Sequence, residues 1–431
     1  MKKIAFHTLG CKLNFSETST LARRFSENGY KTVRFGDEAD IIIINTCSVT
    51  GQADHKCRQA IRRAVKTSPD AFVAVTGCFA QLKTEEIAAI PGVGIVAGAG
   101  EKFNLPDYIE KYLSGQGIGR IYSSGINHVT RFDSSYSMLE RTRSFLKVQD
   151  GCDYHCSYCT VPLARGKSRN APVAELVEQA KSIIGGGIRE IVLSGVNVGD
   201  FGKTTGESLL DLLKALDKVD GLERIRISSI EPNLLNADII DFVSKSKLFV
   251  PHFHIPLQSG SDKLLALMRR RYKRDVFKDR IEKALNVMPD CCIGADIIVG
   301  FPGETDADFE DTFNFISSLN ISYLHVFTYS ERPDTPAATM PGKVPNRVRT
   351  ERSSRLLSLS DIKKQEFYSR FLGKTKRVLW EQKEKGDIIT GFTENYVKVQ
   401  APFNKDLLGR TTDVKLIKIT GSGTVDSEYI L

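Results

Sequence analysis

The sequence lacks both a long apolar run and a high density of cysteine. Apolar runs such as the four isoleucines at 41–44 are far shorter than the roughly 18 residues of a membrane-spanning helix. The N-terminus, MKKIAFHTLGC, has too short an apolar stretch for a secretory signal. Nine cysteines in 431 residues are an odd number and too few for a disulfide scaffold. These absences predict a cytoplasmic protein with no membrane partner and with reduced thiols.

Neither sign of charge dominates, and no repeat or low-complexity tract is present. A formal net charge of +8 permits an anionic partner without establishing one. The chain is 41% hydrophobic and 26% charged, which is ordinary for a globular protein. Its length suggests two to four domains of roughly 100–200 residues each. The domain organisation therefore has to be inferred from the order of the predicted elements.

The first hundred residues alternate between short apolar strands and helices. The strands have continuous apolar runs, and this pattern predicts a parallel, doubly wound α/β sheet in an N-terminal domain at 1–125. Strands are predicted at 3–9, 39–46, 71–77 and 92–98, and helices at 17–29, 55–67 and 83–90.

Three cysteines follow three of these strands. Cys11 ends TLGC, Cys47 ends INTC and Cys78 ends VTGC. In open α/β sheets, ligands bind beyond the carboxyl ends of the strands, so we expect the three thiols to meet at one edge. The alternative is three buried core thiols. Core thiols would fall within the strands rather than just past their ends.

A second, longer alternation starts at residue 143. Six strand–helix units are too few for an eight-stranded barrel and predict a partial, open (βα)6 barrel in a domain at 138–368. The strands are predicted at 143–149, 189–196, 223–231, 249–257, 291–300 and 322–329. After a helix at 346–373, short strands with turn signals predict a small β-barrel at 371–431.

A basic segment joins the two barrels. Residues 342–377 contain eleven Lys and Arg against three Asp and Glu. A small barrel beside such a segment is typical of nucleic-acid binding. The alternative is an ordinary solvated basic face.

The stretch DGCDYHCSYC contains three cysteines within eight positions, Cys152, Cys156 and Cys159. A structural zinc site usually needs four ligands, commonly as two separated pairs. His155 could be a fourth ligand, but it lies inside the loop and is better explained as a spacer. Three thiolates can hold three irons of a 4Fe–4S cluster and leave the fourth iron open. An open iron favours chemistry over electron storage.

The C-x3-C-x2-C spacing after the first strand of a partial barrel resembles the radical S-adenosylmethionine (radical SAM) superfamily. Across essentially the whole chain, further motifs resemble its methylthiotransferases: TLGCKLNFSET, NTCSVT, VTGC, KVQDGCDYHCSYCTVPLARGKSRN, HIPLQSGSDKLLALMRRRY and DIIVGFPGET. The resemblance implies a radical SAM barrel and a TRAM-like C-terminal barrel. It also implies that Cys11, Cys47 and Cys78 hold a second 4Fe–4S cluster.

The resemblance further implies a reaction that uses two SAM molecules, one as methyl donor and one as radical source. It implies two partners besides the substrate, an electron donor such as flavodoxin or ferredoxin and a sulfur donor. TLGCK, CTVPLARGKSRN and HVFTYSERPDTPA are most similar to the subtype that modifies carbon 2 of N6-threonylcarbamoyladenosine, next to the anticodon of tRNA. The other subtypes act on isopentenyladenosine in tRNA or on an aspartate of a ribosomal protein, and Lys12 departs from the residues typical of both.

The resemblance also suggests binding residues. For SAM these are Tyr158, Ser194, Gly195, Ser229, Glu231, Gln258, Ile298 and Gly300. The alternative is that they pack loops or cap helices, and Gly195-Val196 departs from the double glycine of that motif. For the substrate carboxylate the suggested residues are Arg165, Lys167 and Arg169, which could instead pair with phosphate or with a barrel carboxylate.

For the tRNA anticodon stem-loop, the suggested contacts are Lys374, Lys376, Arg377 and, by stacking on a base, Tyr396. Cys57, Cys291 and Cys292 are interpreted as structural. Two other classes stay open on the residues alone. An electron-transfer iron–sulfur protein explains the thiols without the barrel, and an RNA-binding protein explains the basic segment without the thiols.

Overall fold

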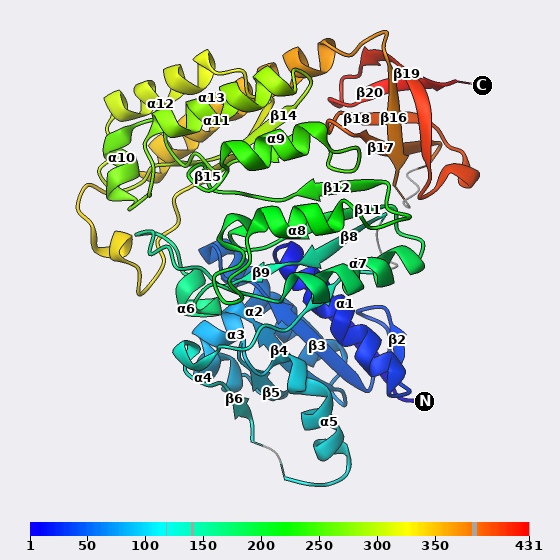
Figure 1. The fold of residues 1–431 in the computed structure, drawn as a ribbon. Helices are drawn as coiled ribbons and strands as arrows, with labels where there is room; N and C mark the ends of the chain where they lie inside the picture. The colour runs from blue at the N-terminus through cyan, green and yellow to red at the C-terminus, as the bar shows by residue number, and fades with distance from the viewer. Residues whose placement is uncertain (118, 139–141, 382–385, 431) are drawn as a thin grey trace.

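The computed structural model describes residues 1–117, 119–138, 142–381 and 386–430. Figure 1 shows three parts: an N-terminal sheet with its helices, a central partial barrel, and a small C-terminal barrel beside the central one. Among the described residues, no helix has both the length and the apolar character that crossing a membrane requires. The fold class predicted from the sequence is confirmed.

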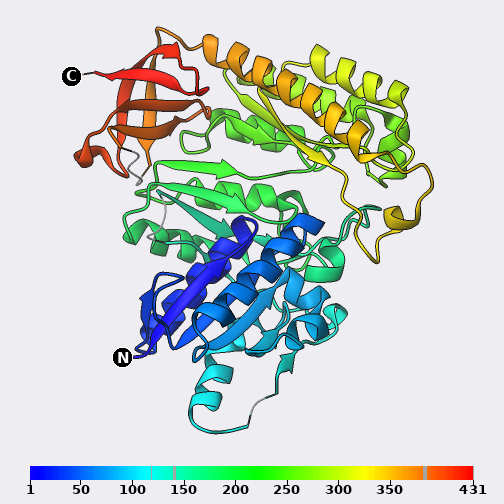
Figure 2. The same cartoon turned by 180° about the vertical axis from the view of Figure 1, so that it is seen from behind.

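The N-terminal sheet is parallel and six-stranded, with the order β2-β1-β3-β4-β5-β6. Its central strands are apolar because helices cover both faces, as the front and back views of the blue region show (Figures 1 and 2). The strands are β1 (Lys3–Thr8), β2 (Lys31–Val33), β3 (Ile41–Thr46), β4 (Phe72–Gly77), β5 (Val93–Ala97) and β6 (Ile121–Tyr122).

The four isoleucines of β3 supply both cores of this domain. Ile41 and Ile43 pack on one face, and Ile42 and Ile44 pack on the other. The first face is covered by α1 (Lys12–Glu27) and α5 (Leu105–Leu113), and the second by α2 (Gly51–Thr67), α3 (Cys78–Leu82) and α4 (Thr84–Ala88).

The central barrel has six parallel strands in two sheets. One sheet has the order β12-β11-β8-β7, where the short β7 pairs antiparallel, and the other has the order β13-β14-β15. Single bridges, Ile225 with Phe249 and Ser229 with His254, connect β12 to the chain at β13. The bounds are β7 (Ser135–Tyr136), β8 (Arg143–Lys147), β11 (Glu190–Ser194), β12 (Arg224–Ile227), β13 (His252–His254), β14 (Cys292–Val299) and β15 (Tyr323–Thr328).

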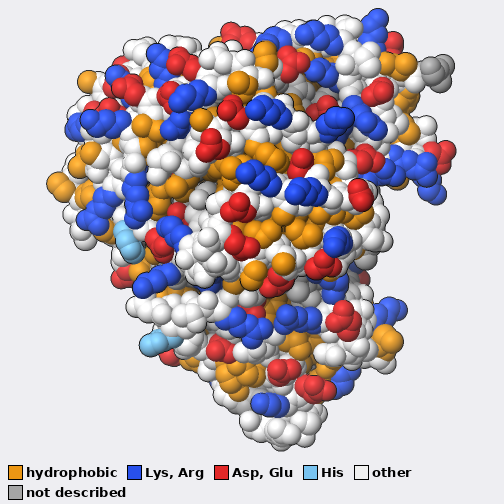
Figure 3. Space-filling view, in the orientation of Figure 1, with side chains coloured by type: hydrophobic (Ala, Val, Ile, Leu, Met, Phe, Trp, Pro, Cys, Tyr) orange, Lys and Arg blue, Asp and Glu red, His pale blue; other side chains and the backbone are white. Residues whose placement is uncertain are grey.

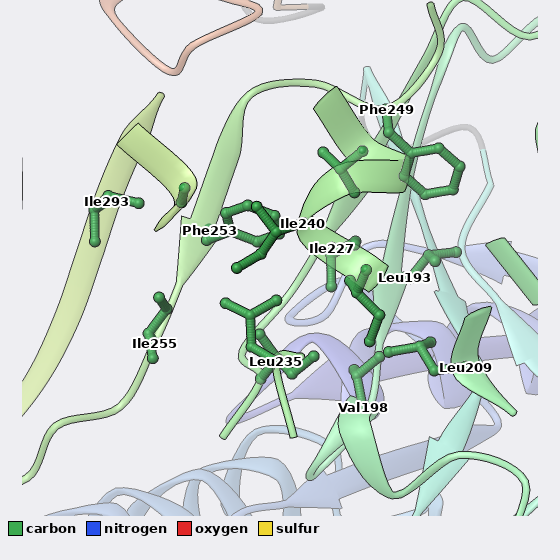
Figure 4. Packing of buried hydrophobic residues seen from close by; sticks show 14 of the residues in the cluster. Leu193, Val198, Leu209, Ile227, Leu235, Ile240, Phe249, Phe253, Ile255 and Ile293 are labelled. Atoms are coloured by element: carbon green, nitrogen blue, oxygen red, sulfur yellow. The ribbon is translucent and has the colours of Figure 1, made fainter. Parts of the chain in front are cut away.

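Helices cover the outside of this barrel and bury one continuous core with its strands. Figure 4 shows Leu193, Ile227 and Phe253 from three successive strands pointing toward Ile240 of α9 and its neighbours. The helices that share this core are α7 (Val173–Gly185), α8 (Leu209–Leu216), α9 (Ala237–Lys245), α11 (Arg274–Val287) and α12 (Asp306–Ser318). Two short helices lie outside it: α6 (Val161–Arg165) packs against α3, and α10 (Asp262–Leu267) contributes Leu264 to a separate cluster. A two-stranded ribbon, β9 (Gln149–Asp150) with β10 (Arg169–Asn170), flanks the loop that carries the second cysteine set.

The long helix α13 (Asn346–Ser369) packs on β15 and leads into the C-terminal barrel. That barrel is closed in the order β16-β17-β18-β20-β19 around the fully buried Trp380. Its strands are β16 (Thr375–Trp380), β17 (Ile388–Thr393), β18 (Lys398–Pro402), β19 (Thr411–Ile419) and β20 (Val425–Tyr429).

Two local expectations differ from the structure. Helix α1 begins at Lys12, five residues before the predicted start at residue 17, because Cys11 takes an extended conformation as its N-cap. The predicted strands also omit β2, a three-residue edge strand without the apolar run that the prediction used. The earlier helix start matters for function because it places residues 12–17 on the first turns beside Cys11.

We expect Phe253→Ala to lower the free energy of unfolding by about 3–5 kcal/mol, because Phe253 is fully buried in the central core. Urea denaturation of the full chain is the measurement. Leu357→Ala on α13 is the control, since Leu357 is 47% exposed and its truncation should change stability by about 0.5 kcal/mol or less. Equal losses for both variants would contradict this core.

Candidate active site

The first cysteine set lies at one edge of the N-terminal sheet. Cys11, Cys47 and Cys78 directly follow or closely follow β1, β3 and β4, which are adjacent strands. Cys11 and Cys78 each follow a glycine in a constrained conformation, whereas Cys47 directly follows the last residue of β3. Gly10 and Gly77 have φ of +113° and +104°, and a Cβ on Gly10 would lie 2.7 Å from Cβ of Cys47. The turns therefore bring separate loops into contact at the thiols.

Burial makes two of these thiols, those of Cys47 and Cys78, costly to ionise without a positive partner. It raises the pKa of Cys47 to about 12, with Cys78 and Cys11 adding to the rise. Burial also raises the pKa of Cys78, against a lowering effect of Arg165. Cys57 is hydrogen-bonded to the backbone of Cys47. Its Sγ accepts the Cys47 N–H at 3.4 Å and donates to the Cys47 carbonyl at 3.3 Å. This contact agrees with the structural role expected of Cys57.

The second cysteine set lies on the loop between β9 and α6. Backbone N–H groups point at two of its sulfurs, from Tyr154 to Cys152 and from Val161 to Cys159, both at 3.4 Å. The third sulfur, on Cys156, accepts from Nη1 of Arg270 at 3.2 Å. Such donors stabilise negative charge on sulfur.

In this set Cys156 is buried and Cys152 and Cys159 are half-buried, and their thiolates would repel one another. Burial raises the pKa of Cys152 and of Cys159 to about 12, and neighbouring cysteines add to each rise. Burial raises the pKa of Cys156 as well, but Arg270 opposes the rise.

Neither cysteine set has the spacing of a single-ion site. Among the described residues, the only three or more His, Cys, Asp or Glu ligand atoms that lie within 4.8 Å of one another belong to His254, Asp296 and His325. A tetrahedral zinc with bonds of about 2.3 Å needs its sulfurs about 3.8 Å apart. The wider spacing of both sets fits a multi-iron cluster better than one zinc ion.

A buried ion cluster joins the two domains between the cysteine sets. Glu17 of α1 pairs with Lys102 of its own domain, with Lys147 of β8 at 3.1 Å and with Arg165 of α6 at 3.0 Å. Asp150 pairs with Lys147 at 2.9 Å, with Arg165 at 2.9 Å and with Arg169 at 3.1 Å. We call these six side chains the interdomain ion cluster.

The two carboxylates of this cluster are held ionised. Burial acts to raise the pKa of Glu17, but Arg165, Lys102 and Lys147 together outweigh it and hold the pKa well below its usual range. For Asp150, Lys147, Arg165 and Arg169 outweigh burial in the same way. The cluster is therefore charged throughout, with four cations against two carboxylates.

Asn14 connects this cluster to the first cysteine set. Its Nδ2 donates to the carbonyls of Leu9 at 2.7 Å and Thr46 at 3.0 Å, which lie in the loops carrying Cys11 and Cys47. Its Oδ1 accepts from Arg165 Nη2 at 2.6 Å. One guanidinium therefore links the loops of the first set to the helix that follows the second.

A second clamp holds the loop after Cys47. Arg332, beyond β15, donates to Oγ of Ser48 at 2.7 Å and pairs with Asp54 at 2.8 Å. Thr160, next to Cys159, donates to the Ser48 carbonyl at 3.2 Å.

Two neighbouring cavities open beside the cysteines. The first, of about 250 Å³, gathers Tyr158, Gln258 and Ile298 from the barrel with Val49 and Thr50 from the loop after Cys47. Three residues proposed for SAM binding thus lie together. Tyr329 also lines this cavity, and its buried hydroxyl has no hydrogen-bond partner among the described residues.

The second cavity, of about 280 Å³, shares Asp296 and Phe327 with the first. Its wall includes Lys12, Arg226 and Tyr396, which come from the N-terminal domain, the central barrel and the C-terminal barrel. All three parts of the chain therefore meet at this cavity.

Its wall also holds two imidazoles around one carboxylate. Oδ1 of Asp296 lies 2.8 Å from Nε2 of His254 and 3.2 Å from Nδ1 of His325. Burial acts to raise the pKa of Asp296, but the two histidines outweigh it and hold the pKa far below its usual range. Two imidazoles and one carboxylate are also a donor set that transition metals accept.

The other residues proposed for SAM lie differently. Ser194 is fully buried, and its hydroxyl donates to the Val192 carbonyl at 3.1 Å. Glu231 is ion-paired with Arg270. Ser229 lines the second cavity.

Both glycines in that proposed set make close protein contacts. A Cβ on Gly195 would lie 2.9 Å from Oε1 of Gln149, and one on Gly300 would lie 2.3 Å from Cγ of Arg349. The hydrogen bond of Ser194 to the Val192 carbonyl and the close contact of Gly300 with Arg349 favour the alternative, in which these two residues have a packing role.

For the proposed carboxylate-binding residues, the structure favours pairing within the protein at two of three positions. Arg165 and Arg169 are about 5% exposed and engage Asp150 in the interdomain ion cluster. They are therefore poorly placed to bind a substrate carboxylate. Lys167 is exposed, and its ammonium forms no ion pair with any residue that the structure describes.

The basic segment 342–377 is partly neutralised by neighbouring acids. Arg349, Arg352 and Arg355 pair with Glu331, Asp306 and Glu310 respectively. On the face shown in Figure 3, Lys and Arg side chains are interspersed with Asp and Glu. The charge count alone therefore overstates the basic surface.

The proposed tRNA contacts surround the start of the C-terminal barrel. Lys374 and Arg377 are exposed, whereas Lys376 pairs with Asp290 at 3.0 Å. Tyr396 lies inward, stacked on Phe392 with ring centroids 4.8 Å apart and with the Arg226 guanidinium 4.7 Å from its ring centre. Its ring borders the second cavity.

The sequence interpretation missed several residues that organise the site. Asn14 and Glu17 follow Cys11 by three and six positions, a helical spacing that the earlier helix start would have made visible. His254, Asp296 and His325 are polar residues inside otherwise apolar strands, which is a usable signal. Nothing local distinguishes Arg270 from its neighbours in the run at 269–271.

The chain matches two family models. Residues 146–316 match the Radical SAM superfamily, and residues 3–98 match Uncharacterized protein family UPF0004.

Similar proteins cover nearly the whole chain. The threonylcarbamoyladenosine tRNA methylthiotransferase MtaB of Bacillus subtilis (strain 168) is 39% identical over 428 residues, covering 97% of this chain and 94% of that protein. The tRNA-2-methylthio-N(6)-dimethylallyladenosine synthase of Rickettsia conorii is 34% identical and covers 97% of each. The solved structure of the radical S-adenosylmethionine methyltransferase TsrM from Kitasatospora setae has a TM-score of 0.61 at 12% identity, over 82% of this chain and 83% of that one, which is a likeness of fold.

We expect Glu17→Gln to destabilise the full chain by about 3–5 kcal/mol, because it leaves buried Lys102, Lys147 and Arg165 with too little negative charge. Denaturation midpoints measure the effect. The control is Glu178→Gln, which breaks an exposed pair with Lys181 and should change stability by about 0.5 kcal/mol or less. Similar small changes in both variants would show that the ion cluster does not hold the domains.

The same cluster predicts how stability depends on pH. Glu17 and Asp150 have lowered pKa values in the folded chain, so their contribution is complete above the unfolded carboxyl pKa of about 4 and is lost as pH falls further. Between about pH 5 and pH 3, wild type should therefore lose more stability than Glu17→Gln. Parallel curves for the two proteins would contradict this assignment.

Proposed function

From the premise that the chain belongs to the radical SAM methylthiotransferase family, we propose that it transfers a methylthio group to carbon 2 of N6-threonylcarbamoyladenosine next to the anticodon of tRNA. The proposed reaction uses two 4Fe–4S clusters and two SAM molecules, one as methyl donor and one as radical source. It also requires an electron donor, such as flavodoxin or ferredoxin, and a sulfur donor. The nine free thiols suit a reducing compartment such as the cytoplasm.

One observation carries the proposal: residues adjoining both cysteine sets line the first cavity together. Val49 and Thr50 follow Cys47 by two and three positions, and Tyr158 lies between Cys156 and Cys159. A single set would suffice for electron transfer. Two sets facing a shared cavity suit a reaction in which two activated groups meet one substrate.

The residues present fit two clusters. Each set offers three thiols without a fourth cysteine ligand in the surrounding motif, and the spacing is too wide for zinc. The interdomain ion cluster has more cations than carboxylates, and Arg165 lies within electrostatic range of Cys78 and Cys11. That positive excess would offset the negative charge of thiolates in the first set.

When bound, the clusters would supply the electron that cleaves SAM and the open iron that carries the transferable sulfur. The chain's own residues position and tune these groups. Arg270 donates to the sulfur of Cys156 and to Tyr158 Oη at 3.4 Å while it is held by Glu231. Tyr158, Gln258 and Ile298 would form the SAM wall of the first cavity, and the N-terminal domain would exclude water from it.

The tRNA would approach from the side of the C-terminal barrel. The exposed Lys374 and Arg377 are proposed to contact phosphate, with Lys376 weaker because Asp290 already pairs with it. The splayed adenosine would enter the second cavity, whose wall includes the ring edge of Tyr396 beside Phe392 and Arg226. Isopentenyladenosine in tRNA and an aspartate of a ribosomal protein remain the alternative substrates within the family.

The substrate test is anaerobic reconstitution with iron and sulfide, followed by SAM, dithionite, a sulfide source and tRNA carrying either modified adenosine. We expect mass spectrometry of the digested nucleosides to find a methylthio product only from threonylcarbamoyladenosine. A product only from isopentenyladenosine would overturn the substrate assignment. Deoxyadenosine without a methylthio product on either tRNA would redirect the search to a protein substrate.

Substitutions in the two cysteine sets should distinguish their roles in the reaction. Cys47→Ala should abolish the methylthio product yet still permit deoxyadenosine formation, whereas Cys156→Ala should abolish both. Each variant should lose about four irons per chain. The matched control is Cys291→Ala, a buried thiol outside both sets that should keep iron content and product. Unchanged iron in Cys47→Ala would contradict the second cluster.

A further inference from the structure

Lys12 presents a positive charge to the second cavity without a partner of its own. It is the first residue of α1, next to Cys11, and its side chain lines the cavity wall. Within the described ranges its ammonium forms no hydrogen bond or ion pair. Burial, with the nearby Arg143 and Arg226, lowers the pKa of Lys12, as expected of an ammonium without a negative partner. An ammonium in such a place favours an anion as its partner.

The cavity wall does not supply that anion. Asp296 is the only carboxylate among its lining residues, and both His254 and His325 already contact its Oδ1. Arg226 adds a second positive charge to the wall, although its Nε is paired with Glu190 at 3.1 Å. The cavity is therefore most favourable to a negative group at its Lys12 end.

The wall also holds polar atoms that lack protein partners. Oγ of Ser228 and Nδ1 of His252 are buried and have no hydrogen bond within the part of the chain that the structure describes. Both residues line the same cavity as Lys12. A ligand that fills it should therefore combine a negative charge with hydrogen-bonding groups.

We propose that Lys12 binds the carboxylate of the threonylcarbamoyl group, so that this cavity is the specificity pocket for the modified base. The inference rests on the proposed function and adds the residue that selects the substrate. The threonylcarbamoyl group carries a carboxylate, a hydroxyl and a urea, which match the ammonium and the unpartnered polar atoms. An isopentenyl group offers none of these and would leave Lys12 unpaired.

Lys12 is assigned the contact with the substrate carboxylate that the sequence analysis suggested for Arg165 and Arg169. Those guanidinium groups are occupied by Glu17 and Asp150, whereas no carboxylate of the described residues lies within ion-pair distance of Lys12. The same ammonium could bind another anion, such as a backbone phosphate of the tRNA. Substrates that differ only at the side-chain carboxylate distinguish these two sources.

The test uses the reconstituted full chain and two anticodon stem-loop RNAs, one carrying threonylcarbamoyladenosine and one its neutral carboxamide. We expect wild type to prefer the acid over the carboxamide by about tenfold or more in kcat/KM. Lys12→Gln should lose most of that preference by lowering kcat/KM for the acid while leaving the carboxamide within about twofold. Lys12→Arg should retain the preference because it retains the charge.

The same comparison is made by binding without reductant, so that it does not depend on turnover. The ratio of the two dissociation constants should show the same acid preference, and Lys12→Gln should remove it. Lys111→Gln on α5 is the charge-matched control and should change neither ratio. Measuring the iron content of each variant distinguishes the loss of a cluster from the loss of the ligand contact.

Each outcome bears on one claim. Equal losses for acid and carboxamide in Lys12→Gln, with a methylthio product still formed by wild type, would overturn the carboxylate contact and leave the proposed function intact. This pattern would instead place Lys12 on phosphate or on SAM. An acid preference in binding that depends on Lys12, without any methylthio product, would overturn the proposed reaction and keep the contact.

Discussion

The interdomain ion cluster is the constraint on which the rest of the site depends. Glu17 comes from the N-terminal domain, whereas Lys147 and Arg165 come from the central barrel, and all three are buried. Charges removed from water are stable only while they remain paired, so the two domains can have only the relative position that satisfies them. That position sets how the two cysteine loops face each other.

A few polar side chains connect the cysteine loops by hydrogen bonds to this cluster and to the end of the barrel. Asn14 joins the loops of Cys11 and Cys47 to Arg165, and Arg332 joins the loop after Cys47 to the end of the barrel. The glycines before Cys11 and Cys78 permit the tight turns that these contacts require. The cavities are therefore bounded by fixed loops, which is what positioning a substrate demands.

Repeating local patterns made much of the fold and the cysteine sets predictable from sequence. Strand–helix alternation gave both α/β parts, and the order of adjacent parallel strands placed Cys11, Cys47 and Cys78 at one sheet edge. The spacing within 152–159 needed no fold at all to bring its thiols together. By contrast, the start of α1 was displaced, because a cysteine N-cap and a glycine before it look like a loop.

The sequence by itself determined the elements, their order and the chemical character of the six cysteines, since these depend on neighbours along the chain. Only the tertiary structure decided which charges stay free. Arg165, Arg169 and Lys12 are all basic residues near a cysteine motif, but Glu17 and Asp150 pair with the two arginines, whereas Lys12 has no ion pair among the described residues. Arg165 pairs with Glu17, 148 residues away in the sequence, and both arginines pair with Asp150. A charge is neutralised by what surrounds it in space, and local sequence does not show those surroundings.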